Sequence, residues 1–321
     1  MKRFLVLAVA LITGCGGLFQ DDADEFRNAS PSRQGIKIEV PSKGQALEAS
    51  DVGSTQQSLL GERASCYTLT RGVTVVVNGG VAWVLGLCEQ IIQYPATTTS
   101  DTQAVWGPWT DSLSPNTYRF TVTKVAKGYD YVLEAKDKSL DDSAYLTLIS
   151  GHHEPGTAKL EGAGSFKVDW DAGQKLPEHG KELGSAEVGY ARNDKLDVTV
   201  DVAFKQVEDA ETGARIDASY AFAKKNGGDG AFEFVVFKDM VGLPNDTAAL
   251  EREAVKSRWQ DNGAGRCDIS FSGGDLTTEV TASECWGESF LETYYQDSLG
   301  ITATQGEEKS CVFANAEYTK L

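Results

Sequence analysis

Basic residues are scarce in this chain. Its 321 residues include 30 lysines and arginines against 47 aspartates and glutamates, which gives a formal net charge of −17. A surface of this sign repels the phosphates of nucleic acids and of anionic lipid headgroups. The composition therefore argues against nucleic acid as a partner, and a basic patch cannot hold the protein to a membrane.

The residues and motifs that usually carry catalysis are also few. The chain has three histidines, His152, His153 and His179, and it lacks a Gly-x-Ser-x-Gly elbow, a phosphate loop, a dinucleotide fingerprint and a Cys-x-x-Cys pair. On a strand, His152 and His153 would point to opposite faces, which disfavours a shared metal ion. The sequence therefore predicts a non-enzymatic protein without cofactor or metal. An envelope hydrolase stays an alternative, because triads are recognised by geometry.

Two short stretches are candidate ligand-binding sites. Residues 169–173 (Asp-Trp-Asp-Ala-Gly) faintly resemble a calcium loop, but the EF-hand spacing is not met, so solvated carboxylates at a strand end are favoured. Trp106 and Trp109 lie within one turn-like stretch, where stacking on a sugar or lipid competes with packing over an open barrel end. Packing is the favoured interpretation.

No uninterrupted apolar run is long enough to cross a bilayer. Residues 58–94 are the most apolar part of the chain after residue 15, and Asn78, Glu89 and Gln90 interrupt them. A hairpin turning at Asn78-Gly79 competes with a helix, because apolar residues recur at steps of three and four. We expect a buried core helix over about 80–94 and leave 58–78 open between helix and strand.

The first fifteen residues have the form of an export signal. Lys2 and Arg3 precede an apolar run over 4–12, and Thr13-Gly14-Cys15 follows. Residues 11–15 (Leu-Ile-Thr-Gly-Cys) resemble the lipobox of bacterial lipoproteins. The resemblance implies a signal peptide over 1–14, cleavage before Cys15, acyl chains on that cysteine and a lipid-anchored place in the cell envelope. Gly16, where an Asp would favour retention in the inner membrane, points to the outer membrane.

Five cysteines follow Cys15, and export would place them in an oxidising compartment. The number is odd, so at least one is free or pairs between molecules. We predict a bridge between Cys285 and Cys311, because one ends a strand and the other begins the last strand. A Cys66–Cys88 bridge is left open, since a hairpin allows it and one continuous helix forbids it.

The remaining organisation is simple. Residues 15–57 resemble an acidic tether, in which the alternating stretch 36–40 (Ile-Lys-Ile-Glu-Val) could pair with a sheet edge. Residues 58–321 are predicted to form a single β-rich domain. From 116 onward, apolar and polar residues alternate between turns, most clearly over 195–205, where Val200 faces inward and Asp201 outward. Residues 246–259 are left between a short helix and a strand.

These patterns predict a mostly β, or α+β, fold: an antiparallel meander curled into a full or partial barrel with a buried helix. The architecture resembles the half-barrel of the lipoprotein-localisation carriers and, more distantly, lipocalins. That resemblance, with the inward aromatic residues Tyr131, Phe204, Phe222 and Phe234, leads to the hypothesis of an envelope lipoprotein that holds a lipid or other apolar ligand. An anchored structural or adhesion module without ligand is the alternative.

Overall fold

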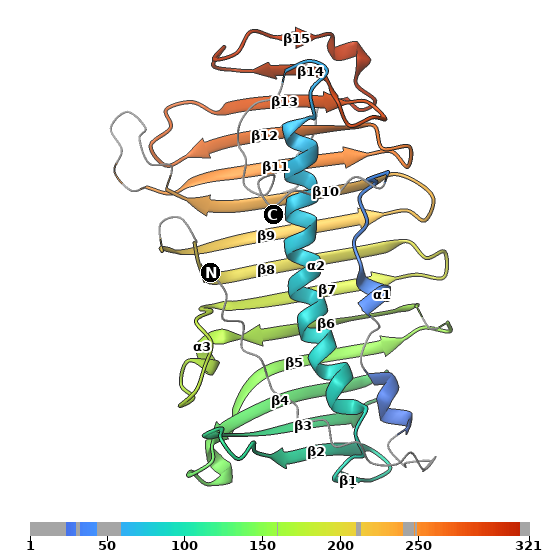
Figure 1. Cartoon of the computed structure of the whole chain (residues 1–321), viewed down its shortest axis with the longest axis vertical. Coiled ribbons are helices and arrows are strands. Elements are labelled where there is room, and N and C mark those ends of the chain that lie inside the picture. The colour runs from blue at the N-terminus through green and yellow to red at the C-terminus, as the bar shows by residue number, and fades with distance from the viewer. Residues whose placement is uncertain are drawn as a thin grey trace.

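The structure is a computed structural model that describes residues 24–29, 33–43, 59–158, 160–209, 213–239, 247 and 249–314. Within these residues, fifteen strands form one antiparallel sheet in which each strand is hydrogen-bonded to the next along the chain. Figure 1 shows this meander stacked along the long axis from β1 to β15. The strands are β1 (Thr98–Thr99), β2 (Gln103–Trp109), β3 (Asn116–Lys124), β4 (Tyr129–Asp137), β5 (Leu146–Pro155), β6 (Gly162–Asp169), β7 (Ser185–Arg192), β8 (Val198–Glu208), β9 (Arg215–Lys224), β10 (Gly230–Lys238), β11 (Glu251–Trp259), β12 (Gly265–Gly273), β13 (Val280–Trp286), β14 (Glu292–Asp297) and β15 (Gln305–Gly306).

The sheet does not close, because β1 and β15 lie at its opposite edges. The predicted mostly β meander is therefore confirmed. Of the two predicted forms, a full and a partial barrel, the open sheet fits the partial one. Both edge strands have only two residues. Short edges offer little backbone for pairing with another chain.

Helix α2 (Ser65–Ile92) lies across one face of the sheet, close to the long axis of the molecule (Figure 1). We call this face the inner face and the opposite one the outer face. The 28 residues of α2 span about 42 Å. The predicted helix over 80–94 is the second half of a longer one, and the alternative hairpin at Asn78-Gly79 is wrong. The other helices are short: η1 (Asp24–Ala29), α1 (Arg33–Ile36), η2 (Asp142–Ala144), α3 (Trp170–Gly173) and η3 (Glu308–Ser310).

Local and tertiary contacts explain why a segment rich in β-branched residues is helical. The Thr70 and Thr74 hydroxyls donate to the carbonyl oxygens four residues earlier, at 2.6 and 2.8 Å. Asn78 is not a turn residue: its side chain accepts from the Ile38 amide at 2.9 Å and donates to the Ile38 carbonyl at 2.8 Å. Packing and these bonds outweigh the low helix propensity of the segment.

Residues 24–29 and 33–43, which we call the N-terminal arm, run beside α2 over the inner face (Figure 1). Phe26, Ile36 and Ile38 are each no more than 2% exposed. The expectation of an acidic tether over 15–57 is thus wrong for this described part, because its few apolar side chains suffice to dock it on the core. Residues 36–40 contact α2 through Ile38 instead of pairing with a sheet edge.

Alternate strand residues face α2 and the arm. Val200 is fully buried and stands in register between Tyr190 and Phe222, whereas Asp201 is exposed, as predicted. The strand begins at Val198 because Leu196 adopts a positive φ of 63° in the preceding turn. The undecided segment 246–259 contains β11. The buried aromatic residues of the inner face include Trp106, Phe120, Tyr131, Phe166, Tyr190, Tyr220, Phe222, Phe232, Trp259 and Trp286.

Candidate functional site

The N-terminal half of α2 is fixed to the sheet by covalent and polar contacts. A disulfide joins Cys66 to Cys267 of β12, with 5.9 Å between the Cα atoms. The Thr70 hydroxyl lies 2.7 Å from the Ser257 hydroxyl of β11. The Cys66 amide donates to Glu284 Oε2 of β13 at 3.0 Å, and this buried carboxylate faces the positive end of the helix dipole. Three neighbouring strands therefore hold this end.

The C-terminal half of α2 rests on the sheet through apolar side chains. Val84, Leu85, Cys88 and Ile92 are buried against the core. Its polar contacts reach the N-terminal arm: Arg33 Nε donates to Glu89 Oε2 at 2.8 Å, and Arg27 Nε donates to the Ile92 carbonyl at 2.9 Å. The N-terminal half of α2 is thus held to the sheet by a disulfide and hydrogen bonds, whereas the polar contacts of the C-terminal half are made with the N-terminal arm.

A small group of polar side chains lies within the apolar interior near this second half. His153 Nδ1 is 2.9 Å from the Tyr190 hydroxyl, and both residues are buried. Tyr131 is 1% exposed, and its hydroxyl has no hydrogen-bond partner among the described residues. Burial raises the pKa of Tyr131 and of Tyr190, raises the pKa of the Cys88 thiol to about 12 and lowers the pKa of His153 to about 4. All four groups are therefore uncharged at neutral pH.

Glycines make room for the two tyrosine rings. Gly151 is the register partner of Tyr131, and a Cβ there would lie 2.3 Å from the Tyr131 Cζ. Gly164 pairs with Tyr190, and a Cβ there would lie 2.5 Å from its hydroxyl. Each ring therefore lies against a glycine of an adjacent strand, Gly151 on β5 and Gly164 on β6. We take this polar group, with the apolar surface around it, as the candidate site.

The cysteine predictions have mixed outcomes. The Cys285–Cys311 bridge is confirmed, with 5.6 Å between Cα atoms. The Cys66–Cys88 bridge is wrong: Cys66 pairs with Cys267, and Cys88 is a buried free thiol, because the continuous helix separates the two cysteines. Cys15 lies outside the described residues. Nothing in the sequence marked Cys267 as the partner, since the pairing depends on where α2 crosses the sheet.

The histidines do not form a shared site. His152 lies on the outer face, where its Nδ1 is 2.7 Å from Asp130 Oδ1 and its Nε2 is 3.5 Å from Glu154 Oε1. The hydrogen bond that the Asp130 carboxylate accepts from the His152 ring raises the pKa of His152. Ser165 is the register partner of His152 on β6, so Asp130, His152 and Ser165 form a row that sequence reasoning missed. Glu154 engages the ring nitrogen that a serine nucleophile would need, so the row lacks the geometry of a triad.

The other two candidate stretches have structural roles. Asp169 caps α3 by accepting from the Ala172 amide at 2.9 Å, and Asp171 accepts from the Gly184 amide at 2.8 Å. Trp106 is buried, and its Nε1 donates to the Tyr94 carbonyl at 2.8 Å. Across the described ranges, no group of three His, Cys, Asp or Glu side chains could hold a metal ion.

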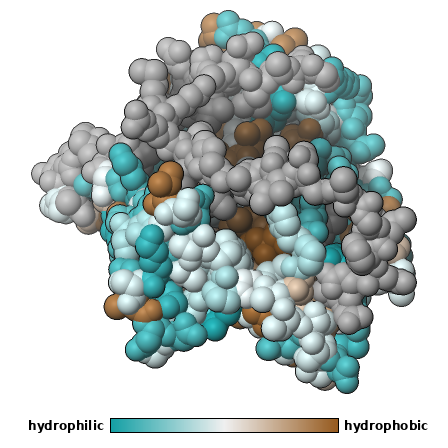
Figure 2. Space-filling model, turned by 60° about the horizontal axis from the view of Figure 1, so that its bottom comes forward, coloured by the Kyte–Doolittle hydropathy of each residue, from teal (hydrophilic) through white to brown (hydrophobic). Residues whose placement is uncertain are grey.

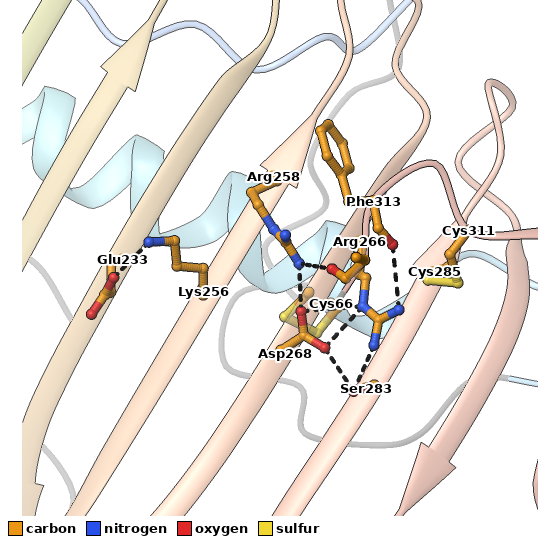
Figure 3. A network of polar contacts seen from close by, with 12 residues as sticks. Cys66, Glu233, Lys256, Arg258, Arg266, Asp268, Ser283, Cys285, Cys311 and Phe313 are labelled. Atoms are coloured by element: carbon orange, nitrogen blue, oxygen red, sulfur yellow. Dashed lines mark hydrogen bonds and ion pairs between the residues drawn. A yellow bond between two sulfur atoms is a disulfide. The ribbon is translucent and has the colours of Figure 1, made fainter. Parts of the chain in front are cut away.

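A polar network on the outer face fixes the C-terminal segment, residues 305–314 (Figure 3). Arg266 is fully buried between Asp268 and Glu308, at 2.9 and 3.1 Å. Arg258 binds Asp268 at 2.7 Å and donates to the Ala314 carbonyl at 2.7 Å. With the Cys285–Cys311 bridge, these bonds make the segment part of the scaffold. The alternating charges of β11 and β12 are visible in the sequence, but their partner segment is not.

The buried histidine gives a pH prediction. The unfolded pKa of a histidine is about 6.5, whereas burial holds that of His153 at about 4. Its contribution to stability is therefore complete above pH 6.5 and is lost as the pH falls toward 4, by up to about 3 kcal/mol. In urea unfolding, we expect the advantage of the wild type over His153→Phe to shrink between pH 7 and pH 4.5.

The neighbouring histidine supplies the control. The raised pKa of His152 stabilises the fold below pH 6.5 and loses its effect as the pH rises through the folded value. The advantage of the wild type over His152→Gln should therefore grow on acidification. Equal pH dependence in both variants would contradict the burial of a neutral His153.

The chain was compared with protein-family models, curated proteins and solved structures. No family model matches the chain, and no curated protein or solved structure matches it.

Proposed function

We propose that this chain is a non-enzymatic, lipid-anchored protein of the bacterial cell envelope, attached to the outer membrane through Cys15, that holds an apolar ligand between α2 and the sheet. The inner face supports this proposal, because it carries a long series of aromatic side chains beneath a single helix. Seen from the β1 end, apolar surface gathers in a hollow bordered by hydrophilic residues (Figure 2). Concave apolar surfaces with few polar groups are typical of sites for small apolar molecules.

The unequal attachment of α2 is the observation that carries the ligand proposal. One half is bonded to β11, β12 and β13, and the other packs on apolar side chains beside the unpaired Tyr131 hydroxyl. A buried hydroxyl without a partner costs about 1–3 kcal/mol. A ligand with a polar head and an apolar body would satisfy that hydroxyl and replace the apolar contacts of the helix.

Native mass spectrometry of the intact protein, released in mild detergent, tests the proposal. We expect an adduct that dissociates on activation and is extracted by organic solvent. Tyr131→Phe should weaken retention of the adduct. Tyr294→Phe should not, because Tyr294 is equally buried but belongs to the outer face, where its hydroxyl donates to Gln296.

An anchored structural module without ligand is the second candidate, and the arm favours it. Phe26, Ile36 and Ile38 already occupy part of the inner face. Protein that carries no adduct and takes up no fluorescent fatty acid after delipidation would contradict the ligand proposal and leave this module as the function.

The anchor has its own test. Cys15→Ser removes the thiol that would carry the acyl chain, so the variant should move from the membrane fraction to the soluble fraction. If it still sediments with membranes at high salt, acylation of Cys15 is not what attaches the protein.

A further inference from the structure

The side of α2 that faces away from the sheet is apolar. Val75, Val76 and Trp83 are 54%, 62% and 56% exposed, and Gly79 and Gly80 are exposed between them. Residues 75, 79 and 83, like 76 and 80, are four apart, so all five lie on one helical face. We call this face, formed by Val75, Val76, Gly79, Gly80 and Trp83, the apolar ridge. Figure 1 shows α2 lying over the sheet with this length of helix uncovered by strands.

The ridge is unusual for a helix of a soluble domain. Only 28% of the most apolar 18-residue stretch of α2 is buried. No charged residue stands between Arg71 and Glu89, in a chain whose net charge is −17. An exposed apolar surface of this kind usually marks an interaction site.

We propose that the ridge rests on a lipid surface with uncharged or zwitterionic headgroups. This inference rests on the proposed anchor. The arm meets the C-terminal end of α2, where Arg27 binds the Ile92 carbonyl. Arg27 lies twelve residues after Cys15, and a chain of that length reaches at most about 43 Å. Acyl chains at Cys15 would therefore keep α2 close to the membrane. Tryptophan favours the membrane interface, and the acidic remainder of the protein is repelled by anionic lipid.

Fluorescence quenching tests this contact in the lipidated full chain mixed with phosphatidylcholine vesicles. Trp83 is the most exposed of the six tryptophans, so brominated phosphatidylcholine should remove its emission selectively. Trp83→Phe should abolish the quenching. Val76→Asp should reduce it, whereas Ile301→Asp should not, because Ile301 is 81% exposed near the distant β15 end. Both aspartate variants add the same charge at an exposed apolar position.

The outcomes separate the ridge from the anchor. Protein that floats with the vesicles but shows no quenching contradicts the ridge and leaves the anchor intact. Protein that does not float contradicts both. Unquenched protein that forms a dimer, and becomes monomeric in Val76→Asp, would assign the ridge to a second copy of this chain instead.

Discussion

Replacing both Cys66 and Cys267 with alanine should destabilise the protein more than any other change that keeps the inner face apolar. The bridge spans 201 residues, and closing a loop of that length stabilises a fold by about 5 kcal/mol in the chain-entropy description. It also holds α2 on β12. In urea unfolding without reductant, we expect a correspondingly lower free energy of unfolding.

The Cys285–Cys311 pair is the matched control. It closes only 26 residues, which corresponds to about 3.5 kcal/mol, and it holds the C-terminal segment on the outer face. Its double alanine variant should leave the amide protons of α2 protected from hydrogen exchange, whereas the Cys66/Cys267 variant should expose them. Equal protection of α2 in the two variants would contradict the role of Cys66–Cys267 as the clamp of the helix.

Val200→Asp should lower the free energy of unfolding by several kcal/mol. Val200 is fully buried on the inner face between Tyr190 and Phe222. A carboxylate there loses its hydration without gaining a partner, and neutralising it by protonation is itself unfavourable at pH 7. We therefore expect a large fall in the melting temperature, measured on variant protein that has the same fold as the wild type before heating.

Asp201→Val, one residue later, is the control. Asp201 is exposed on the outer face. Partial desolvation of its carboxyl raises its pKa, so the fold does not stabilise its charge. The variant should therefore unfold within about 0.5 kcal/mol of the wild type. Similar losses of unfolding free energy in Val200→Asp and Asp201→Val would contradict the assignment of these residues to opposite faces.

The sequence revealed those parts of the fold that depend on local pattern. Alternation of apolar and polar residues identified the strands and the inward side of Val200, because a side chain on a strand needs only its neighbours to choose a face. Short turns identified the meander. The Cys285–Cys311 bridge was predicted from a strand expected to begin at Cys311, but β14, β15 and η3 return the chain to Cys285, and Cys311 begins no strand.

Features that depend on distant contacts were not visible. The first half of α2 is helical because the sheet and Ile38 hold it, and its β-branched residues pointed elsewhere. The arm looked like a tether because three buried side chains are too few to stand out in a polar segment. The inner-face group of Tyr131, His153 and Tyr190 joins three strands, so no spacing in the sequence reports it.

The order in which the chain emerges gives the clamp a further consequence. Cys66 leaves the ribosome long before Cys267, so its disulfide partner is absent while most of the sheet is still being made. Cys88 is the nearest thiol during that interval. A continuous helix keeps the two cysteines about 33 Å apart, which is far beyond disulfide reach. The intact helix therefore keeps Cys66 away from the wrong partner, and a helix-breaking Gly79→Pro should lead to Cys66–Cys88 pairing when the reduced protein is refolded under oxidising conditions.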